Sequence, residues 1–204
     1  HVRSRRQRQM CIRDRYVASH EGLKRFEFDL QLINEKRPHI LDAEQEKLLT
    51  EAQDALSTPG NVFSMFDNAD LTFEDVTDKD GQKHPLTQGT FIKYLESDDR
   101  VLRKSAFENV YKAYGSYNNT LGATLAGEVK KHVFNARSHH YESARAQALG
   151  NNNIPEEVYD NLVKTVHEYL PLLHRYTKLR KSLLGVEDLK MYDMYTPMVK
   201  DCLL

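Results

Sequence analysis

The pattern of apolar positions is helical over most of the chain and is clearest between Asn151 and Gly185. Apolar residues recur there at spacings of three and four, namely Val158, Leu162, Val166, Leu170 or Tyr169, Leu173 and Tyr176. This spacing predicts one long amphipathic helix whose apolar stripe faces the rest of the protein. Pro155 suits a first turn, which places the start near Ile154, and Gly185 suits the left-handed residue that closes a helix.

Two further helices are predicted near the beginning of the chain. The first covers residues 20–34 and is expected to end before Pro38, because the residue before a proline avoids the helical conformation. The second is capped by Asp42, with Gln45 three residues later as in a capping box, and is expected to stop at Thr58-Pro59-Gly60. Since the connection is short, the two helices are expected to lie antiparallel.

The period of the pattern changes between residues 71 and 86. Leu71, Phe73 and, past an irregularity, Val76 lead into Asp78-Lys79-Asp80-Gly81, and residues 82–86 run back. The Asp80-Gly81 dipeptide can take the positive φ angles of a tight turn. This predicts a β-hairpin. The preceding segment, residues 61–69, is apolar but has no clear period.

The pattern after Gly89 is helical again. Ser97 is predicted to cap a helix that bends or breaks between Gly115 and Asn119, because glycine weakens a helix interior. A short helix is predicted from Ser143 to Leu149. Beyond Gly185 the mixture of Met, Tyr and β-branched residues predicts the start of a strand.

Composition and charge limit the classes of function. The 204 residues carry a formal net charge of −1, but residues 1–15 hold six Arg and one Asp (+5), which leaves −6 for the remainder. Two interpretations of the basic head are a nucleic-acid or membrane-binding arm and a disordered or non-native extension, and the second is favoured. No apolar run approaches the ~18 residues of a membrane helix. Cys11 and Cys202 lie near opposite ends, which fits a reducing compartment.

The nine histidines were tested against metal-binding geometry. His167 and His174 are seven residues apart, as are His132 and His139, and seven residues span about 10.5 Å of a helix, too far for one zinc ion. The zinc-protease motif H-E-x-x-H is absent. A structural role is therefore favoured for every histidine. Phosphate-binding and nucleophile-elbow motifs are absent too.

Three segments nevertheless resemble a known family. They read LTQGTFIKYLESDDRVLRKSAFENVYKAY (86–114), SARAQALGNNNIPEEVYDNLVKTVHEYLPLLHRYTKLRKSLLG (143–185) and LKMYDMYTPMV (189–199). Together they closely resemble the amino-terminal part of oligoendopeptidase F, a bacterial zinc metallopeptidase of the thimet-oligopeptidase-like M3 family. The resemblance covers about residues 17–199 in unbroken order.

The resemblance implies a function for the whole protein, and it implies that this chain lacks the residues that carry out the reaction. It implies a zinc-dependent metalloendopeptidase that hydrolyses short oligopeptides in the bacterial cytoplasm, with zinc held by H-E-x-x-H and a downstream Glu. None of those positions exists in this chain, so no catalytic, cofactor-binding or metal-binding residue is assigned and the chain alone is expected to be inactive and to bind no zinc. The part present resembles the substrate-restricting lobe; neither nucleic acid nor membrane is expected as a partner.

The predicted fold class is mainly α. Antiparallel helical hairpins and long helices are expected to form one lobe with one small β-hairpin at about residues 71–86. The predicted divisions are an Arg-rich extension (1–16), a helical hairpin with the β-hairpin (17–88), an oligoendopeptidase F-like helical lobe (89–185) and the truncated start of the catalytic region (186–204). The alternative function is a stand-alone helical scaffold for protein–protein interaction. If the chain is the amino-terminal part of an oligoendopeptidase F, Leu162→Ala or Leu173→Ala is expected to cost about 2 to 5 kcal/mol, the usual range for a buried leucine.

Overall fold

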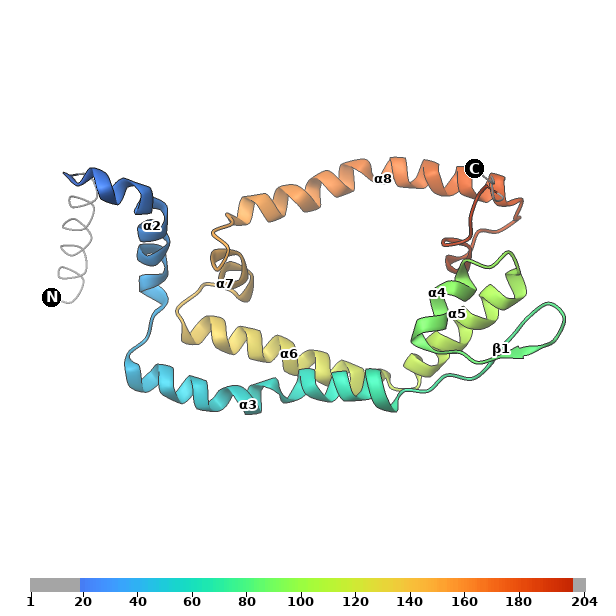
Figure 1. The fold of residues 1–204 in the computed structure, drawn as a ribbon, viewed down its shortest axis with the longest axis horizontal. Coiled ribbons are helices and arrows are strands. Elements are labelled where there is room, and N and C mark those ends of the chain that lie inside the picture. Colours follow the sequence, from blue (N-terminus) through green and yellow to red (C-terminus); the bar gives the residue numbers. More distant parts are fainter. Residues whose placement is uncertain (1–18, 200–204) are drawn as a thin grey trace. The chain divides into compact units, whose positions relative to one another are not determined.

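The computed structural model describes residues 19–199 (Figure 1). The basic head with Cys11, and Cys202 at the other end, lie outside the described residues. Contacts divide the chain into two units, one formed by residues up to Leu56 with Val129–Val158 and one by Ser57–Glu128 with the residues from Tyr159 onward. The predicted mainly α fold class is confirmed.

The first unit begins with a 3-10 helix at Glu21–Phe26, followed by α2 (Glu27–Lys36), a 3-10 turn (Arg37–His39) and the start of α3 (Ala43–Met65). The predicted capping box is confirmed: Gln45 N donates to Asp42 Oδ1 over 2.9 Å, and Asp42 N donates to Gln45 Oε1 over 3.4 Å.

The expected antiparallel pairing of α2 with α3 is wrong. α2 turns away from α3 at the connection instead of packing along it (Figure 1). The connection is held elsewhere, because His39 Nδ1 lies 2.8 Å from the carbonyl oxygen of His139 and its ring stacks on Tyr141 at a centroid distance of 3.5 Å. These contacts hold the residues that connect α2 to α3 beside the residues that follow α6 (Asn118–Ser138).

The predicted stop at Thr58-Pro59-Gly60 is also wrong. α3 continues through Pro59 to Met65, and a π-helix follows at Phe66–Asp70, so the apolar segment of unclear period is helical. A Cβ atom added to Gly127 of α6 would lie 2.6 Å from Pro59 Cγ. The ring of Pro59 therefore packs directly on the backbone of Gly127, which has no side chain. α3 and α6 approach each other closely at the point where α3 continues through the proline.

The predicted β-hairpin is confirmed. Strands β1 (Val76–Thr77) and β2 (Lys83–His84) pair antiparallel, with Val76 opposite His84. Gly81 has φ +79° and its N–H donates to the carbonyl of Asp78 over 3.1 Å. Glycine is favoured at such a positive φ because it has no Cβ atom.

Two helices, α4 (Gln88–Leu95) and α5 (Arg100–Gly115), follow the hairpin. The predicted cap at Ser97 is wrong, because Asp99 occupies the cap position and its Oδ1 accepts from Val101 N over 2.9 Å. Its other oxygen accepts from Lys79 N over 2.7 Å, so the same carboxylate ties the hairpin turn to α5. The predicted break after Gly115 is confirmed, since α6 begins at Asn118.

The last third of the chain contains the predicted short helix, α7 (Ala144–Gly150), which Ser143 caps, and α8 (Glu156–Leu184). α8 begins two residues after Ile154, runs through Pro171 and is closed by Gly185 with φ +64°. The expected strand after Gly185 is wrong. Met191–Asp193 forms a 3-10 turn, because Asp193 is drawn inward by arginines.

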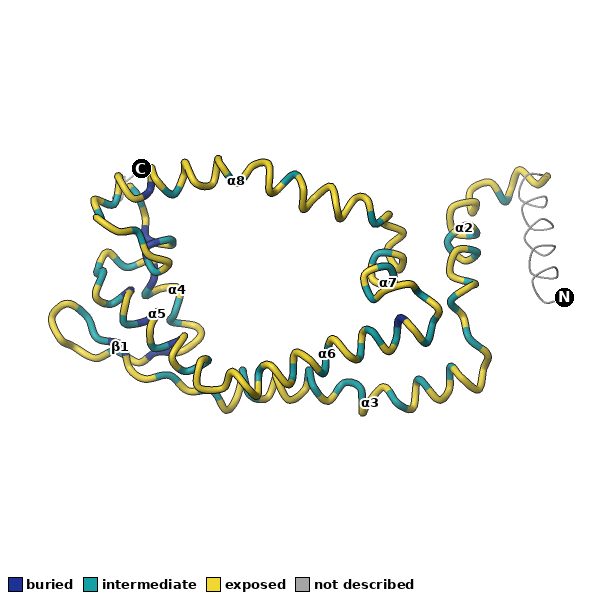
Figure 2. Tube along the Cα trace, turned by 180° about the vertical axis from the view of Figure 1, so that it is seen from behind, coloured by how far each residue is buried: buried dark blue, intermediate teal, exposed yellow. Residues whose placement is uncertain are grey.

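The core lies in the second unit, where β1, α4 and α5 meet (Figure 2). Its buried members are Val76, Leu86, Ala106 and Val110, and Phe73, Phe91, Tyr94, Leu102 and Tyr114 pack against them. Tyr114 also donates a 2.6 Å hydrogen bond to Asp67 Oδ1, which raises the pKa of the tyrosine to about 12. The hairpin, α4 and α5 thus share one small core.

The apolar stripe of α8 is not part of that core. Among the described residues Leu162 is 60% exposed and Leu173 is 52% exposed, and Val158, Val166 and Tyr176 are exposed as well. Figure 2 shows most of α8 in the colour of exposed residues. The expectation that the stripe is buried is therefore wrong for this chain. Arg180, on the same face one turn beyond Tyr176, is the buried residue of α8.

Candidate functional site

A buried ionic cluster around Asp193 is the most elaborate polar arrangement in the second unit. The Asp193 carboxylate is fully buried and accepts from Arg100 Nε at 3.2 Å and Nη2 at 3.0 Å, and from Arg103 Nη2 at 2.9 Å. Lys190 N donates to its Oδ2 over 3.0 Å. Burial alone raises the pKa of Asp193, but the hydrogen bonds from Arg100 and Arg103 outweigh it and hold the pKa below its usual value.

Arg180 ties the same segment to α8. Its Nε donates to the carbonyl of Asp193 over 2.9 Å, and its Nη2 donates to the carbonyl of Thr196. Thr196 Oγ1 in turn donates to the carbonyl of Leu95 over 3.3 Å. α4, α5 and α8 therefore all hold residues 190–196. These side chains contain no nucleophile with an adjacent base, so the cluster serves to position the segment.

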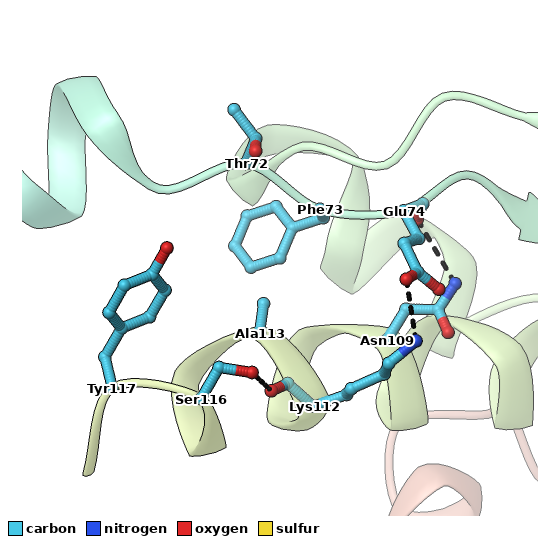
Figure 3. Close-up of a pocket in the computed structure, with 8 residues that line it drawn as sticks. All are labelled: Thr72, Phe73, Glu74, Asn109, Lys112, Ala113, Ser116 and Tyr117. Atoms are coloured by element: carbon cyan, nitrogen blue, oxygen red, sulfur yellow. Dashed lines mark hydrogen bonds and ion pairs between the residues drawn. The ribbon is translucent and has the colours of Figure 1, made fainter.

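A surface pocket of about 300 Å³ lies between the chain leading into β1 and α5 (Figure 3). Thr72, Phe73 and Glu74 line it on one side. On the other side Asn109 Nδ2 donates to the carbonyl of Asp75 over 2.9 Å, and Lys112 Nζ lies 2.6 Å from Glu74 Oε1. Both charged groups of this pair are largely exposed to solvent. The pocket offers aromatic and polar contacts for binding, and its charges already neutralise each other.

The histidines that have contacts in the structure are held by structural partners. His139 Nδ1 lies 2.8 Å from the carbonyl of Asn135, and its Nε2 lies 3.7 Å from Glu46 Oε2. His84 Nε2 lies 2.7 Å from Asp78 Oδ2, a bond that lowers the pKa of the aspartate. His167 and His174 both lie on α8. Across residues 19–199 no three of His, Cys, Asp and Glu come together as metal ligands, so these residues do not fit a zinc site.

Sequence reasoning missed the Asp193 cluster. The available signal was Arg100 and Arg103 at a spacing of three on one helix, which places both guanidinium groups on one face. Nothing in the local pattern indicates that their acceptor lies ninety residues further along, within an apparent strand. The helices of residues 19–199 include none that is both long and apolar enough to span a bilayer.

The chain belongs to peptidase family M3. A sequence profile described as Peptidase family M3 matches residues 93–202, more than half of the chain, and one described as Oligopeptidase F matches residues 13–73. Within the first match, hydrogen bonds to Asp193 hold α5 and α8 to the segment that follows α8.

Named relatives share most of this chain but are much longer. Oligopeptidase PepF of Bacillus subtilis is 50% identical over 186 residues, which cover 91% of this chain and 28% of PepF. The crystal structure of oligoendopeptidase-F from Enterococcus faecium matches with a TM-score of 0.84 at 41% identity, covering 93% of this chain and 36% of the other. A putative peptidase from Chlamydophila abortus matches with a TM-score of 0.86 at 32% identity, covering 89% and 31%. The chain thus spans about a third of the proteins it matches.

Proposed function

We propose that this chain acts as the amino-terminal, substrate-restricting lobe of a zinc-dependent M3 endopeptidase that hydrolyses short oligopeptides. The observation that carries the proposal is the match of 91% of this chain to 28% of an oligopeptidase. The zinc ion would supply the activated water when bound, and its ligands would come from the part of the longer relatives that this chain does not match. We place the whole protein in the bacterial cytoplasm, where its short peptide substrates would be met.

The lobe would contribute steric selection instead of bond cleavage. The Asp193 cluster fixes α4, α5 and α8 to one another, and a rigid wall of this kind excludes a folded protein without touching the scissile bond. Exposed apolar residues in the earlier turns of α8, such as Leu162 and Val166, supply a surface on which the remainder of a longer enzyme can pack.

The first test uses the 204-residue chain alone. It is expected to cleave no internally quenched peptide and to retain no stoichiometric zinc after dialysis. One zinc ion per chain together with chelator-sensitive cleavage would sink the proposal. Full-length PepF from Bacillus subtilis, assayed in parallel, controls for the quality of the peptide and the buffer.

The second test restores the rest of an enzyme. In a chimera, residues 17–199 replace the matching segment of Bacillus subtilis PepF. The chimera is expected to cleave a short peptide and to spare the same sequence embedded in a folded protein. Equal cleavage of both substrates, with PepF itself discriminating, would show that this lobe does not restrict entry.

The exposed stripe of α8 favours one alternative, a stand-alone helical scaffold that binds a partner protein. A scaffold is expected to remain a soluble species of defined size and to unfold cooperatively. A lobe taken from a larger enzyme is expected to bind a hydrophobic dye and to aggregate, because its apolar stripe has no cover. Light scattering and dye binding on the isolated chain separate the two.

A further inference from the structure

A groove of about 640 Å³ lies beside the last turns of α8, entirely within the second unit. Its apolar walls are Leu173 of α8 and three residues of the returning segment, Leu189, Met191 and Met194. We call it the methionine groove. Its volume falls in the range of sites that hold small ligands and short peptide segments.

The rim of the methionine groove is cationic. Lys178 and Lys181 come from α8, and Lys190 comes from the returning segment. Asp188 pairs with Lys190 at 2.5 Å, so the four groups carry a net charge of +2. Within residues 19–199 Lys178 forms no ion pair. The helix dipole favours lysines at the end of α8 and Asp188 pairs with Lys190, but one carboxylate among three lysines leaves the rim positively charged.

The groove is preformed. Arg180 binds the carbonyl groups of Asp193 and Thr196, and the carboxylate of Asp193 is held by α5, so the returning segment is fixed against α8 from both sides. Met191 nevertheless remains 67% exposed on the wall. Methionine side chains are flexible and polarizable, and surfaces rich in them accommodate peptides of varied sequence.

We propose that the methionine groove docks a short peptide that carries an apolar side chain next to a carboxylate. The apolar side chain would lie between Leu173 and Met191, and the carboxylate would meet the ammonium groups of the rim. The carboxylate can belong to an acidic side chain or to the free C-terminus. As a docking site for short peptides, this inference rests on the proposed function, and it adds a preference for acidic or free-acid peptides.

The binding test uses the full 204-residue chain and dye-labelled short peptides of Leu, Ala and Glu, followed by fluorescence anisotropy. Binding is expected within the range of about 1 μM to 1 mM in which enzymes commonly hold their substrates. Replacing Glu by Gln and amidating the C-terminus is expected to weaken binding about tenfold and to remove most of its salt dependence. Applying each change separately identifies which carboxylate the rim recognises. Equal binding of the neutral peptide, or no binding up to about 1 mM, would overturn the proposal.

Two variants locate the site, with a matched control on the same helix. Lys178→Glu is expected to weaken binding of the acidic peptide about five- to tenfold, and Met191→Gln is expected to weaken the acidic and neutral peptides alike. Lys164→Glu changes the net charge of the chain by the same amount but lies outside the groove, where Lys164 pairs with Glu168 at 3.9 Å. If Lys164→Glu weakens binding as much as Lys178→Glu, the attraction is general and the groove is not the site.

The chimera with PepF separates this proposal from the proposed function. In an active chimera, Lys178→Glu is expected to raise KM for acidic peptides about fivefold relative to KM for the neutral peptide. No effect of Lys178→Glu in an active chimera would mean that the rest of the enzyme covers the groove, which overturns the docking proposal and leaves the proposed function standing. An inactive chimera with intact binding by the isolated chain would instead count against the proposed function alone.

Discussion

Arg103 Nη2 lies 2.9 Å from Asp193 Oδ1, and both side chains are almost completely buried although ninety residues separate them in the sequence. A buried guanidinium–carboxylate pair is expensive to break, because removing one partner leaves an uncompensated charge out of water. The contact between these two residues therefore controls whether the segment after α8 can stay folded against α5.

Asp193→Asn is expected to destabilise the chain by about 3 to 5 kcal/mol, the usual cost of breaking a buried ion pair. Urea unfolding followed by circular dichroism measures the loss. Asp188→Asn is the matched control, because Asp188 is exposed and pairs with Lys190 at the surface, and its loss is expected to stay within about 1 kcal/mol. Equal losses for the two variants would mean that Arg103 finds other partners.

The stability that Asp193 contributes is expected to depend on pH. Its pKa is lowered from the ordinary value of 3.8, so the unfolded chain takes up a proton at a higher pH than the folded one. The contribution is therefore complete above pH 3.8 and is lost as the pH falls through the lower pKa of the folded state. In urea titrations the difference in free energy of unfolding between the wild type and Asp193→Asn is expected to be constant above this pH and to become smaller below it. If this difference in free energy of unfolding grew as the pH fell, the ion pair would not be the source of the stability.

Tyr114→Phe is expected to cost about 1 kcal/mol, because the hydrogen bond to Asp67 is lost. This bond raises the pKa of Tyr114 from 10.0 to about 12, so its contribution is complete below pH 10 and disappears as the pH rises through about 12. Burial also raises the pKa of Tyr141, so ultraviolet difference titration should show one late-ionising tyrosine fewer in the variant than in the wild type. Tyr111→Phe, at an exposed position on the same helix, is expected to change neither stability nor the late ionisation.

Gly127→Ala is expected to destabilise the chain by about 1 to 3 kcal/mol, since the added methyl would collide with Pro59 and force α3 and α6 apart. Gly122→Ala lies on the same helix with nothing within 4 Å of the added carbon. It is expected to stabilise by up to about 1 kcal/mol through helix propensity alone. If thermal melts show that both variants shift the melting temperature in the same direction, the close contact with Pro59 does not matter for stability.

Leu162→Ala and Leu173→Ala are now expected to cost less than about 1 kcal/mol in the isolated chain, below the range expected for buried leucines, because both side chains are more than half exposed. Leu95→Ala, at a position only 2% exposed, is expected to cost about 2 to 5 kcal/mol. Chemical unfolding of the three variants checks this order. A large loss at Leu162 would mean that its stripe is covered in solution, for example by a second copy.

Local signals in the sequence predicted most of the secondary structure. The Asp42–Gln45 capping box, the turn at Gly81 and the closing Gly185 each act within a few residues, and each was located correctly. Pro59 was misread because the surface that accommodates it belongs to Gly127, far along the chain. The strand expected after Gly185 failed for the same reason, since Arg100 and Arg103 decide the conformation of Asp193 from a distance.

The candidate sites were less predictable than the helices. The stripe of α8 was recognised from its period, but a period shows only that a face is apolar and cannot show what covers it. The methionine groove requires Lys190 and Lys178 to line the same pocket, and that placement depends on Arg180 holding the returning segment. The absence of H-E-x-x-H, by contrast, is a property of the sequence itself.

Because Asp193 follows Arg103 by ninety residues in the sequence, the two side chains can pair only late in the synthesis of the chain. A ribosome delivers α4, α5 and the hairpin long before it delivers Asp193, so the arginines of α5 must stay hydrated while the chain is still growing. The small core around Val76 and Val110 can then assemble early, but α5 and α8 become locked only after the last turn has left the exit tunnel. During that interval Arg100 and Arg103 lack the carboxylate that neutralises them in the folded chain.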